Sequence, residues 1–288
     1  MIKNDHERIR VYYPGSDIQK LLNKSLIKIF DDNGDLLLKF IKCKYILFET
    51  SDEGKDIAVI EINNKFIKIF VDCFDNLKVI EEIYIENLYN FKFNSDSVVL
   101  DVGMNIGASS LFFASFDNIK KVYGFEPFKG TFDVAEKNIE LNNYAASKIE
   151  RFNYGLGSAH VTLKVPLPPN GSLGGSTSDF VFGELLDESK RTLTSVEIQG
   201  ICENLNKIHQ SENDRKIILK LDCEGAEYEI IESLRKNNLI DKVDIFLIEY
   251  HLKGNQELIK IFIENGFSLF APGSPDVSLF GMLYVFKI

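Results

Sequence analysis

Cysteines and clustered basic residues are scarce in this sequence, and long apolar runs are absent. The four cysteines are far apart and show no metal-ligand spacing, which favours small buried residues in a reducing compartment over a disulfide pair. They are Cys43, Cys73, Cys202 and Cys223. No dense run of Lys or Arg occurs, and the net charge is −10. A duplex nucleic-acid partner is therefore not expected, because its phosphates normally require a basic face.

The longest apolar stretch, residues 98–116, is interrupted by Asp101, Asn105 and two glycines. It does not predict a membrane-spanning helix. The first ten residues, MIKNDHERIR, lack the apolar core of a signal peptide. We therefore expect a cytoplasmic protein. Its 45% hydrophobic content is ordinary for a globular protein with a full core, and its acidic balance suits a neutral small molecule or a sugar as partner better than a polyanion.

Residues 1–92 form the first predicted domain, which is rich in β-strand patterns. Two runs, residues 57–62 and 66–71, flank Asn63-Asn64-Lys65, a hairpin signal because asparagine tolerates positive φ. A further strand is expected within residues 36–48. Exposed strand edges here could pair two copies of the chain, so we interpret this region as a cap or a homodimer interface.

From residue 93 to 288 short apolar strands alternate with amphipathic segments. The expected strands are 97–101, 121–126, 149–154, 216–222, 243–249, 267–270 and 282–286. The expected helices are 107–116, a helix from Pro127 to about 142, 226–237 and 255–265. Such alternation predicts an α/β, Rossmann-like fold with a mostly parallel sheet. Ligands of such sheets bind beyond the carboxyl ends of the strands.

The loop from Asp101 to Gly107 follows the first of these strands and opens a helix. Gly103 and Gly107 let the backbone turn sharply and approach a ligand, and the helix N-terminus offers unpaired N–H groups. Glu126 ends the next strand, where an acid can accept both hydroxyls of a ribose. A dinucleotide site needs glycine where this chain has Asn105, whereas S-adenosylmethionine (SAM) has no phosphate and tolerates a side chain there. The pattern favours SAM over NAD.

Four motifs in order resemble the FkbM-type methyltransferases. They are VVLDVGMNIGASSLFFAS, YGFEPFKGTFDVAEKNIELNN, ILKLDCEGAEYEII and IFLIEYH. The resemblance covers about residues 80–288 and implies a class I SAM-dependent methyltransferase domain over residues 93–288. That fold is a seven-stranded sheet whose last strand runs antiparallel, preceded here by the β-rich N-terminal extension.

The resemblance also implies roles by position. The implied cofactor-binding residues are Asp101, Gly103, Met104, Asn105, Gly107, Glu126, Pro127, Asn153, Leu156 and Asp222. The implied catalytic residues are Asp222, Glu224, Glu249 and His251. Glu227 completes an Asp-x-Glu-Gly-x-Glu signature. Glu86 and Tyr89 stand where members often have an acid and an aromatic residue, which could close over the cofactor or simply pack on the sheet.

Methyl transfer to a hydroxyl requires an aligned acceptor and removal of its proton. Asp222 and Glu224 follow one strand, and Glu249 and His251 end its neighbour, so all four are expected at one rim of the sheet. We expect His251 or Asp222 to take the proton while Glu249 orients or shares it. Glu224 or Glu227 could instead favour a helix N-terminus. No metal is expected, although the same cluster could hold Mg²⁺ or Mn²⁺.

The leading hypothesis is an O-methyltransferase for a hydroxyl on a sugar, glycolipid or related natural product. An N-methyltransferase for an amino or guanidino group, whose cation the acids would hold, is the first alternative. A non-catalytic SAM-fold binding module and a nicotinamide oxidoreductase are the others. The Gly-, Pro- and Ser-rich stretch 166–179 is interpreted either as a surface loop or as a lid over the substrate.

Overall fold

The structure is a computed structural model of the 288-residue chain. It describes residues 34–43, 45–89, 91, 94–166, 193–212, 215–272 and 279–287. The chain divides into two compact units, Met1–Asn90 and Phe91–Ile288, and the predicted site residues from Asp101 onward all belong to the second. Within the described ranges, no helix has the length and apolar character that crossing a bilayer requires.

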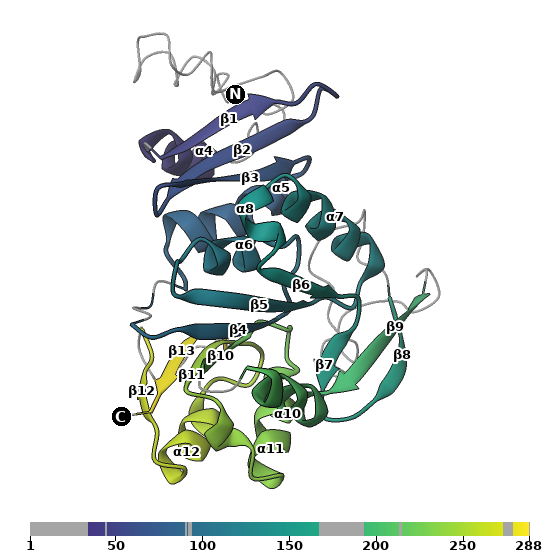
Figure 1. Ribbon diagram of the computed structural model, residues 1–288, viewed down its shortest axis with the longest axis vertical. Coiled ribbons are helices and arrows are strands. Elements are labelled where there is room, and N and C mark those ends of the chain that lie inside the picture. Colours follow the sequence, from purple (N-terminus) through teal and green to yellow (C-terminus); the bar gives the residue numbers. More distant parts are fainter. Residues whose placement is uncertain are drawn as a thin grey trace, which may run out of the picture. The chain divides into compact units, whose positions relative to one another are not determined.

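The first unit is built on an antiparallel three-stranded sheet in the order β1-β2-β3. Its elements (Figure 1) are α4 (Gly34–Lys42), β1 (Ile46–Thr50), β2 (Asp56–Ile62), β3 (Lys65–Val71), α5 (Phe74–Ile80) and the π-helical turn η1 (Glu81–Ile85). Asn63 and Asn64 make the turn between β2 and β3 with φ of 51° and 59°. The predicted hairpin is therefore confirmed.

Helix α4 replaces most of the strand expected within residues 36–48. Leu36, Leu37 and Phe40 are its buried residues, a spacing that forms one face of a helix, and β1 begins only at Ile46. The strand expected within this range is therefore present only in its last residues, 46–48, and the helix was not predicted, because a short apolar run fits a buried helix as well as a strand. The role expected for Glu86 and Tyr89 over a cofactor stays a prediction.

A seven-stranded sheet forms the centre of the second unit, in the order β12-β13-β11-β10-β4-β5-β6. Its strands are β4 (Ser97–Val102), β5 (Ile119–Phe125), β6 (Ile149–Phe152), β10 (Lys216–Leu221), β11 (Ile245–Tyr250), β12 (Ser268–Phe270) and β13 (Gly281–Phe286). Strand β13 runs antiparallel to both of its neighbours, and the other pairs are parallel. The expected Rossmann-like sheet with an antiparallel last strand is confirmed.

Helices cover both faces of this sheet (Figure 1). On one face lie α6 (Ala108–Ala114), α7 (Lys129–Glu140) and α8 (Asn143–Ala146), and on the other α10 (Ile201–Ser211), α11 (Glu227–Lys236) and α12 (Gln256–Glu264). A 3-10 turn, η4 (Ile240–Lys242), precedes β11. Helix α7 buries Phe132, Ala135 and Ile139, a spacing that places them on one face of the helix.

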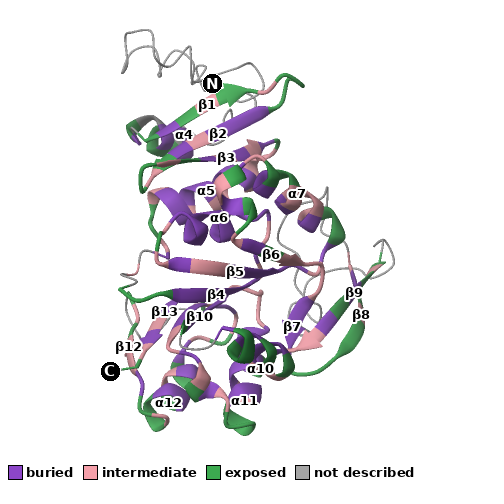
Figure 2. Cartoon of the chain, in the orientation of Figure 1, coloured by how far each residue is buried: buried purple, intermediate pink, exposed green. Residues whose placement is uncertain are grey.

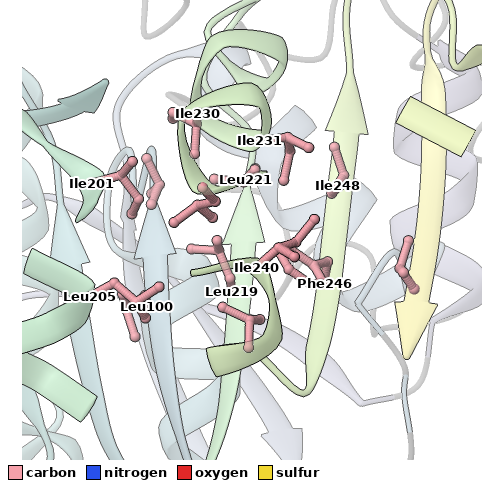
Figure 3. Close-up of a cluster of buried hydrophobic side chains, with 14 of the residues drawn as sticks. Leu100, Ile201, Leu205, Leu219, Leu221, Ile230, Ile231, Ile240, Phe246 and Ile248 are labelled. Atoms are coloured by element: carbon pink, nitrogen blue, oxygen red, sulfur yellow. The ribbon is translucent and has the colours of Figure 1, made fainter. Parts of the chain in front are cut away.

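The central strands are buried along most of their length, as the purple colour in Figure 2 shows. Leu219 and Leu221 of β10 lie in the middle of the main core, together with Ile230 and Ile231 of α11 (Figure 3). A parallel sheet that is covered on both faces needs apolar side chains at successive positions. The continuous apolar runs of the sequence therefore correspond to these strands.

A small sheet and the helix that follows it, both in the second unit, were not predicted. A small sheet in the order β7-β9-β8 consists of β7 (Gly155–Gly157), β8 (Val161–Pro166) and β9 (Leu193–Gly200), and helix α10 follows it. Of the stretch interpreted as a loop or lid, only Pro166 lies within the described residues, and it ends β8.

The strand order reverses between β4 and β10. The chain adds β5 and β6 on one side of β4 and then returns to its other side, where Val102 of β4 pairs with Leu221 of β10. The carboxyl ends of these two strands therefore lie next to each other. In open α/β sheets, a ligand binds in the crevice at such a reversal.

Replacing Ile231 by alanine is expected to lower the free energy of unfolding by about 2–5 kcal/mol, because a fully buried side chain leaves a cavity. Ile263 of α12 is 61% exposed and serves as the matched control. Its alanine variant is expected to change stability by no more than about 0.5 kcal/mol. Urea denaturation measures both variants, and equal losses would contradict the packing of α11 on the sheet.

Candidate functional site

The loop between β4 and α6 lies against the ends of two strands. Gly103 has a φ of +76°, and a Cβ at this position would lie 1.8 Å from the carbonyl oxygen of Asp222. Only glycine permits this approach. The N–H groups of Gly103 and Met104 both donate to the carbonyl oxygen of Phe125 at 3.0 Å. Asn105 has a φ of 52°, which asparagine tolerates better than most residues.

Glu126 directly follows β5 and is only 5% exposed. Its Oε2 accepts the N–H of Asn105 at 3.2 Å, and its Oε1 accepts the N–H of Phe128 at 2.9 Å. Burial raises the pKa of Glu126 to about 7, although these two donors act in the opposite direction. Because a carboxylate oxygen can accept more than one hydrogen bond, Glu126 can also bind hydroxyl groups of a ligand.

A cleft opens beside this carboxylate, at the reversal between β4 and β10. Its empty space is about 540 Å³, a volume that includes solvent at its open side. Its lining residues are Val102, Gly103, Asn105, Glu126, Pro127, Phe128, Gly155, Leu156, Asp222, Cys223 and Glu224. Three of these residues are carboxylates, whereas Pro127, Phe128 and Leu156 form an apolar wall. A ligand with a polar diol and an aromatic base would find suitable contacts here.

Lys220 of β10 is a buried cation next to the loop between β4 and α6, with 1% of its surface exposed. Its Nζ donates to the carbonyl oxygen of Gly103 at 2.7 Å and lies 3.1 Å from Oδ1 of Asp101 and 3.5 Å from Oδ2 of Asp222. Burial alone would lower the pKa of Lys220, but the charges of Asp101 and Asp222 outweigh it and raise that pKa. One ammonium group therefore joins the ends of β4 and β10.

Asp101 is fully buried and is not among the residues that line the cleft. Its Oδ2 accepts the hydroxyls of Ser109 and Ser110, at 2.7 and 2.6 Å, from the first turn of α6. Its other oxygen faces Lys220. Asp101 therefore holds the start of α6 directly, and it holds the loop through Lys220, which donates to Gly103.

Four polar side chains meet next to the cleft, where β10 and β11 end. They form the acid–histidine rim, which consists of Asp222, Glu224, Glu249 and His251. Nε2 of His251 lies 4.0 Å from Oε2 of Glu224 and 4.0 Å from Oε1 of Glu249. Asp222 and Glu224 also line the cleft. The structure thus brings together the four residues that were expected at one rim.

A fourth carboxylate, Glu227, lies next to the three carboxylates of this rim. Its Oε1 is 3.1 Å from Nδ1 of His251. Burial alone would lower the pKa of His251, but the contact with Glu227 and the charges of Glu224 and Asp222 raise it to about 9. His251 is therefore a cation at neutral pH in the free protein. Burial also raises the pKa of Glu224, in spite of the nearby histidine.

The rim could also hold a divalent cation. One oxygen of Asp222, one oxygen of Glu224 and one ring nitrogen of His251 lie within 4.8 Å of one another. Acidic groups are often arranged in this way without a metal ion. A cation would also have to displace the proton of His251, since metal-binding imidazole is neutral.

Six of the ten predicted cofactor residues line the cleft, namely Gly103, Asn105, Glu126, Pro127, Leu156 and Asp222. The other four, Asp101, Met104, Gly107 and Asn153, are not among the lining residues. Met104 is fully buried, Gly107 has a φ of +81° at the start of α6, and Nδ2 of Asn153 donates to the carbonyl oxygen of Glu126 at 2.9 Å. Sequence reasoning missed four lining residues, Val102, Phe128, Gly155 and Cys223. Each is adjacent in sequence to a predicted residue, a signal that could have found them.

Replacing Lys220 by methionine is expected to lower the free energy of unfolding by about 3–5 kcal/mol, because it leaves the buried Asp101 without its cation. The double variant D101N/K220M should recover part of this loss. Lys216 of the same strand pairs with Asp244 at the surface, so K216M should cost no more than about 1 kcal/mol. Urea denaturation compares the three, and equal losses for K220M and K216M would contradict a structural role of the buried pair.

Two known proteins with similar sequences are named as methyltransferases. The family model of the methyltransferase FkbM domain matches residues 101–269. "Methyltransferase 1" of Beauveria bassiana is 27% identical over 213 residues, which cover 68% of this chain and 82% of that protein. "Methyltransferase sdnD" of Sordaria araneosa is 26% identical over 182 residues, or 54% of this chain and 68% of that protein.

Among solved structures, the methyltransferase FkbM from Methylobacillus flagellatus has a TM-score of 0.46 and 16% sequence identity. The match covers 72% of this chain, which spans about half (47%) of the length of that protein. The family model matches more than half of the chain, from the end of β4 to β12. The chain therefore belongs to the family of methyltransferase FkbM domains.

Proposed function

We propose that this chain transfers the methyl group of SAM to a hydroxyl of a sugar, glycolipid or related natural product. The observation that carries the proposal is the continuity of the cleft with the acid–histidine rim. Asp222 and Glu224 belong to both, and His251 lies 4.0 Å from Glu224. A cofactor in the cleft and an acceptor at the rim would therefore contact the same two carboxylates.

The residues of the cleft fit SAM by their chemistry. Glu126 accepts one backbone N–H on each oxygen and keeps acceptor positions for the two hydroxyls of a ribose. Pro127, Phe128 and Leu156 offer apolar contacts that suit an adenine ring. When bound, SAM supplies an electrophilic methyl group on a positively charged sulfur. The carboxylates of the cleft favour a ligand of that charge.

The rim supplies groups that can orient an acceptor and take its proton. His251 must first lose its own proton to act as a base, whereas Asp222 can accept a proton directly. Glu249, 4.0 Å from His251, orients the imidazole or shares the proton. Because hydroxyl groups are weak acids, we propose that the proton leaves while the methyl group is transferred. A positioned base contributes about 10²–10⁴-fold to such a rate.

A second candidate, methylation of an amino or guanidino group, is favoured by the number of carboxylates at this site. Glu227 and three carboxylates of the rim surround a single histidine. That negative charge would hold a cationic acceptor. The proposal for the first unit remains a cap or a homodimer interface, and the proposed compartment is the cytoplasm.

Transfer of a labelled methyl group from SAM to a panel of sugars, glycolipids and amines tests the proposal. Label in an alkali-stable ether of a hydroxylated acceptor would support O-methylation, and label found on amines alone would contradict it. Parallel reactions after exhaustive EDTA treatment decide whether the rim works with a metal. Calorimetry that detects no binding of SAM or S-adenosylhomocysteine (SAH) would refute the function as a whole.

Two variants should separate cofactor binding from turnover. Glu126→Gln removes the acceptor charge from the cleft, and SAH is expected to bind at least about tenfold more weakly, a loss of one charge-assisted hydrogen bond. His251→Ala should bind SAH nearly as the wild type does, yet lose about 10²-fold or more in turnover. Glu150→Gln, on the exposed side of β6, is the control for E126Q. Weak SAH binding by H251A would place His251 in the cofactor site instead.

SAH binding should depend on pH through Glu126, whose pKa is about 7. Above that pH the group is a carboxylate that accepts ribose hydroxyls, and below it the group is protonated and accepts them poorly. The Kd of SAH is therefore expected to rise by up to about tenfold for each pH unit below 7. Calorimetry from pH 8 to pH 5.5 measures this rise, which E126Q should abolish. A rise of the same size in E126Q would assign it to another group.

A further inference from the structure

Glu227 is the first residue of α11 and is fully buried, unlike the carboxylates of the acid–histidine rim. Its Oε1 accepts the N–H of Cys223 at 2.9 Å, and its Oε2 accepts the N–H of Gly225 at 2.9 Å. Oε1 also lies 3.1 Å from Nδ1 of His251. The loop after β10 and the residue after β11 therefore converge on one carboxylate.

These contacts determine which nitrogen of His251 keeps its proton when the imidazole becomes neutral. Both oxygens of Glu227 face backbone N–H groups, so the carboxylate acts as an acceptor and Nδ1 of His251 is the donor. Nε2 then lies on the side of Glu224 and Glu249, each 4.0 Å away. When His251 loses one proton, Nε2 is the nitrogen that becomes free to accept another.

We propose that Glu227 is a positioning residue for methyl transfer, which holds His251 as the Nδ1–H tautomer with Nε2 toward the acid–histidine rim. Glu227 does not line the cleft, so it acts through His251 and through the loop that carries Asp222 and Glu224. The catalytic part of this inference rests on the proposed function. The tautomer and the orientation of His251 do not.

A purely local explanation exists for the same residue. An acid in the first turn of a helix is stabilised by the positive N-terminal end, whatever lies nearby. Glu257 occupies the first turn of α12 and is exposed. Like Glu227, it lies in the first turn of its helix, but it has no contact with the rim among those described, which makes Glu257→Gln the matched control.

Four carboxylates of the described residues face His251. Glu227 comes from α11, Asp222 and Glu224 from the loop after β10, and Glu249 from β11. Glu227 lies 3.1 Å from Nδ1 of His251, whereas Glu224 and Glu249 each lie 4.0 Å from Nε2. Removing the charge of Glu227 should therefore lower the pKa of His251 markedly, although the other three carboxylates remain.

The wild-type protein tests the tautomer without any variant. The chain has four histidines, so ¹⁵N–¹H spectra of its imidazoles can be assigned by comparison with His251→Gln. At pH 10, above the pKa of about 9, His251 is expected to be neutral with its proton on Nδ1. A spectrum that shows the proton on Nε2 would overturn the proposal.

Glu227→Gln tests the positioning role. In this variant the pKa of His251 is expected to fall by about one pH unit or more, toward its ordinary value of about 6.5. The pH at which turnover reaches its plateau should fall with it, and the plateau should be about 10²-fold lower because the imidazole is no longer fixed. Binding of SAH should change less than turnover does, because Glu227 does not line the cleft. E257Q should change none of these values.

Several outcomes would contradict the proposal. An unchanged pKa of His251 in E227Q, or an equal loss of turnover in E227Q and E257Q, would leave only the helix-terminal explanation. If E227Q does not fold, the tautomer of the wild type decides. If the wild type methylates no acceptor, the proposed function fails, whereas the tautomer of His251 and its pKa in E227Q, both read from imidazole NMR spectra, still decide how Glu227 holds His251.

Discussion

The carbonyl oxygen of Asp222 occupies the space in which a side chain at Gly103 would begin, so the loop after β4 and the end of β10 are in direct contact. Such contact buries main-chain carbonyls, and Lys220 satisfies one of them with a 2.7 Å hydrogen bond to Gly103. A buried ammonium is tolerable only when it is paired, and Asp101 lies 3.1 Å away. The ion pair and the loop therefore require each other. The cleft is bounded by this loop, and its shape depends on both.

Glu126 and His251 both have raised pKa values, for different physical reasons. Burial disfavours the charged form of Glu126, whereas neighbouring carboxylates favour the charged form of His251. A positive charge in the cleft would lower both pKa values. In the proposed function, a bound sulfonium would thus favour the Glu126 carboxylate, which binds the cofactor, and neutral His251, which can accept a proton. Cofactor binding would prepare the rim for the acceptor through charge alone.

The sequence predicts those parts of the molecule whose signals are local. Apolar runs locate the buried strands, and Gly103 and Glu126 follow their strands in a recognisable pattern. The role of Lys220 cannot be predicted in this way. A lysine inside an apolar strand comes to lie next to Asp101 only because β10 pairs with β4. The small sheet cannot be predicted in this way either, since β7 pairs in parallel with β9 across a long separation in the chain. The sequence pattern does not predict contacts between segments that are far apart in the chain.

Under the proposed function, the arrangement of charges would also restrict the acceptor. Lys220 is engaged by Asp101 and Asp222, and His251 by Glu227, so the described cations of the site are already paired with its own acids. Glu249 and Glu224 are partly exposed and add further negative charge on the open side of the rim. An acceptor that carries phosphate, sulfate or carboxylate near its reacting group would be repelled there. Under the proposed function, a neutral polyol or an amine would meet hydrogen-bond acceptors instead, so the negative charge of the rim would select against anionic acceptors.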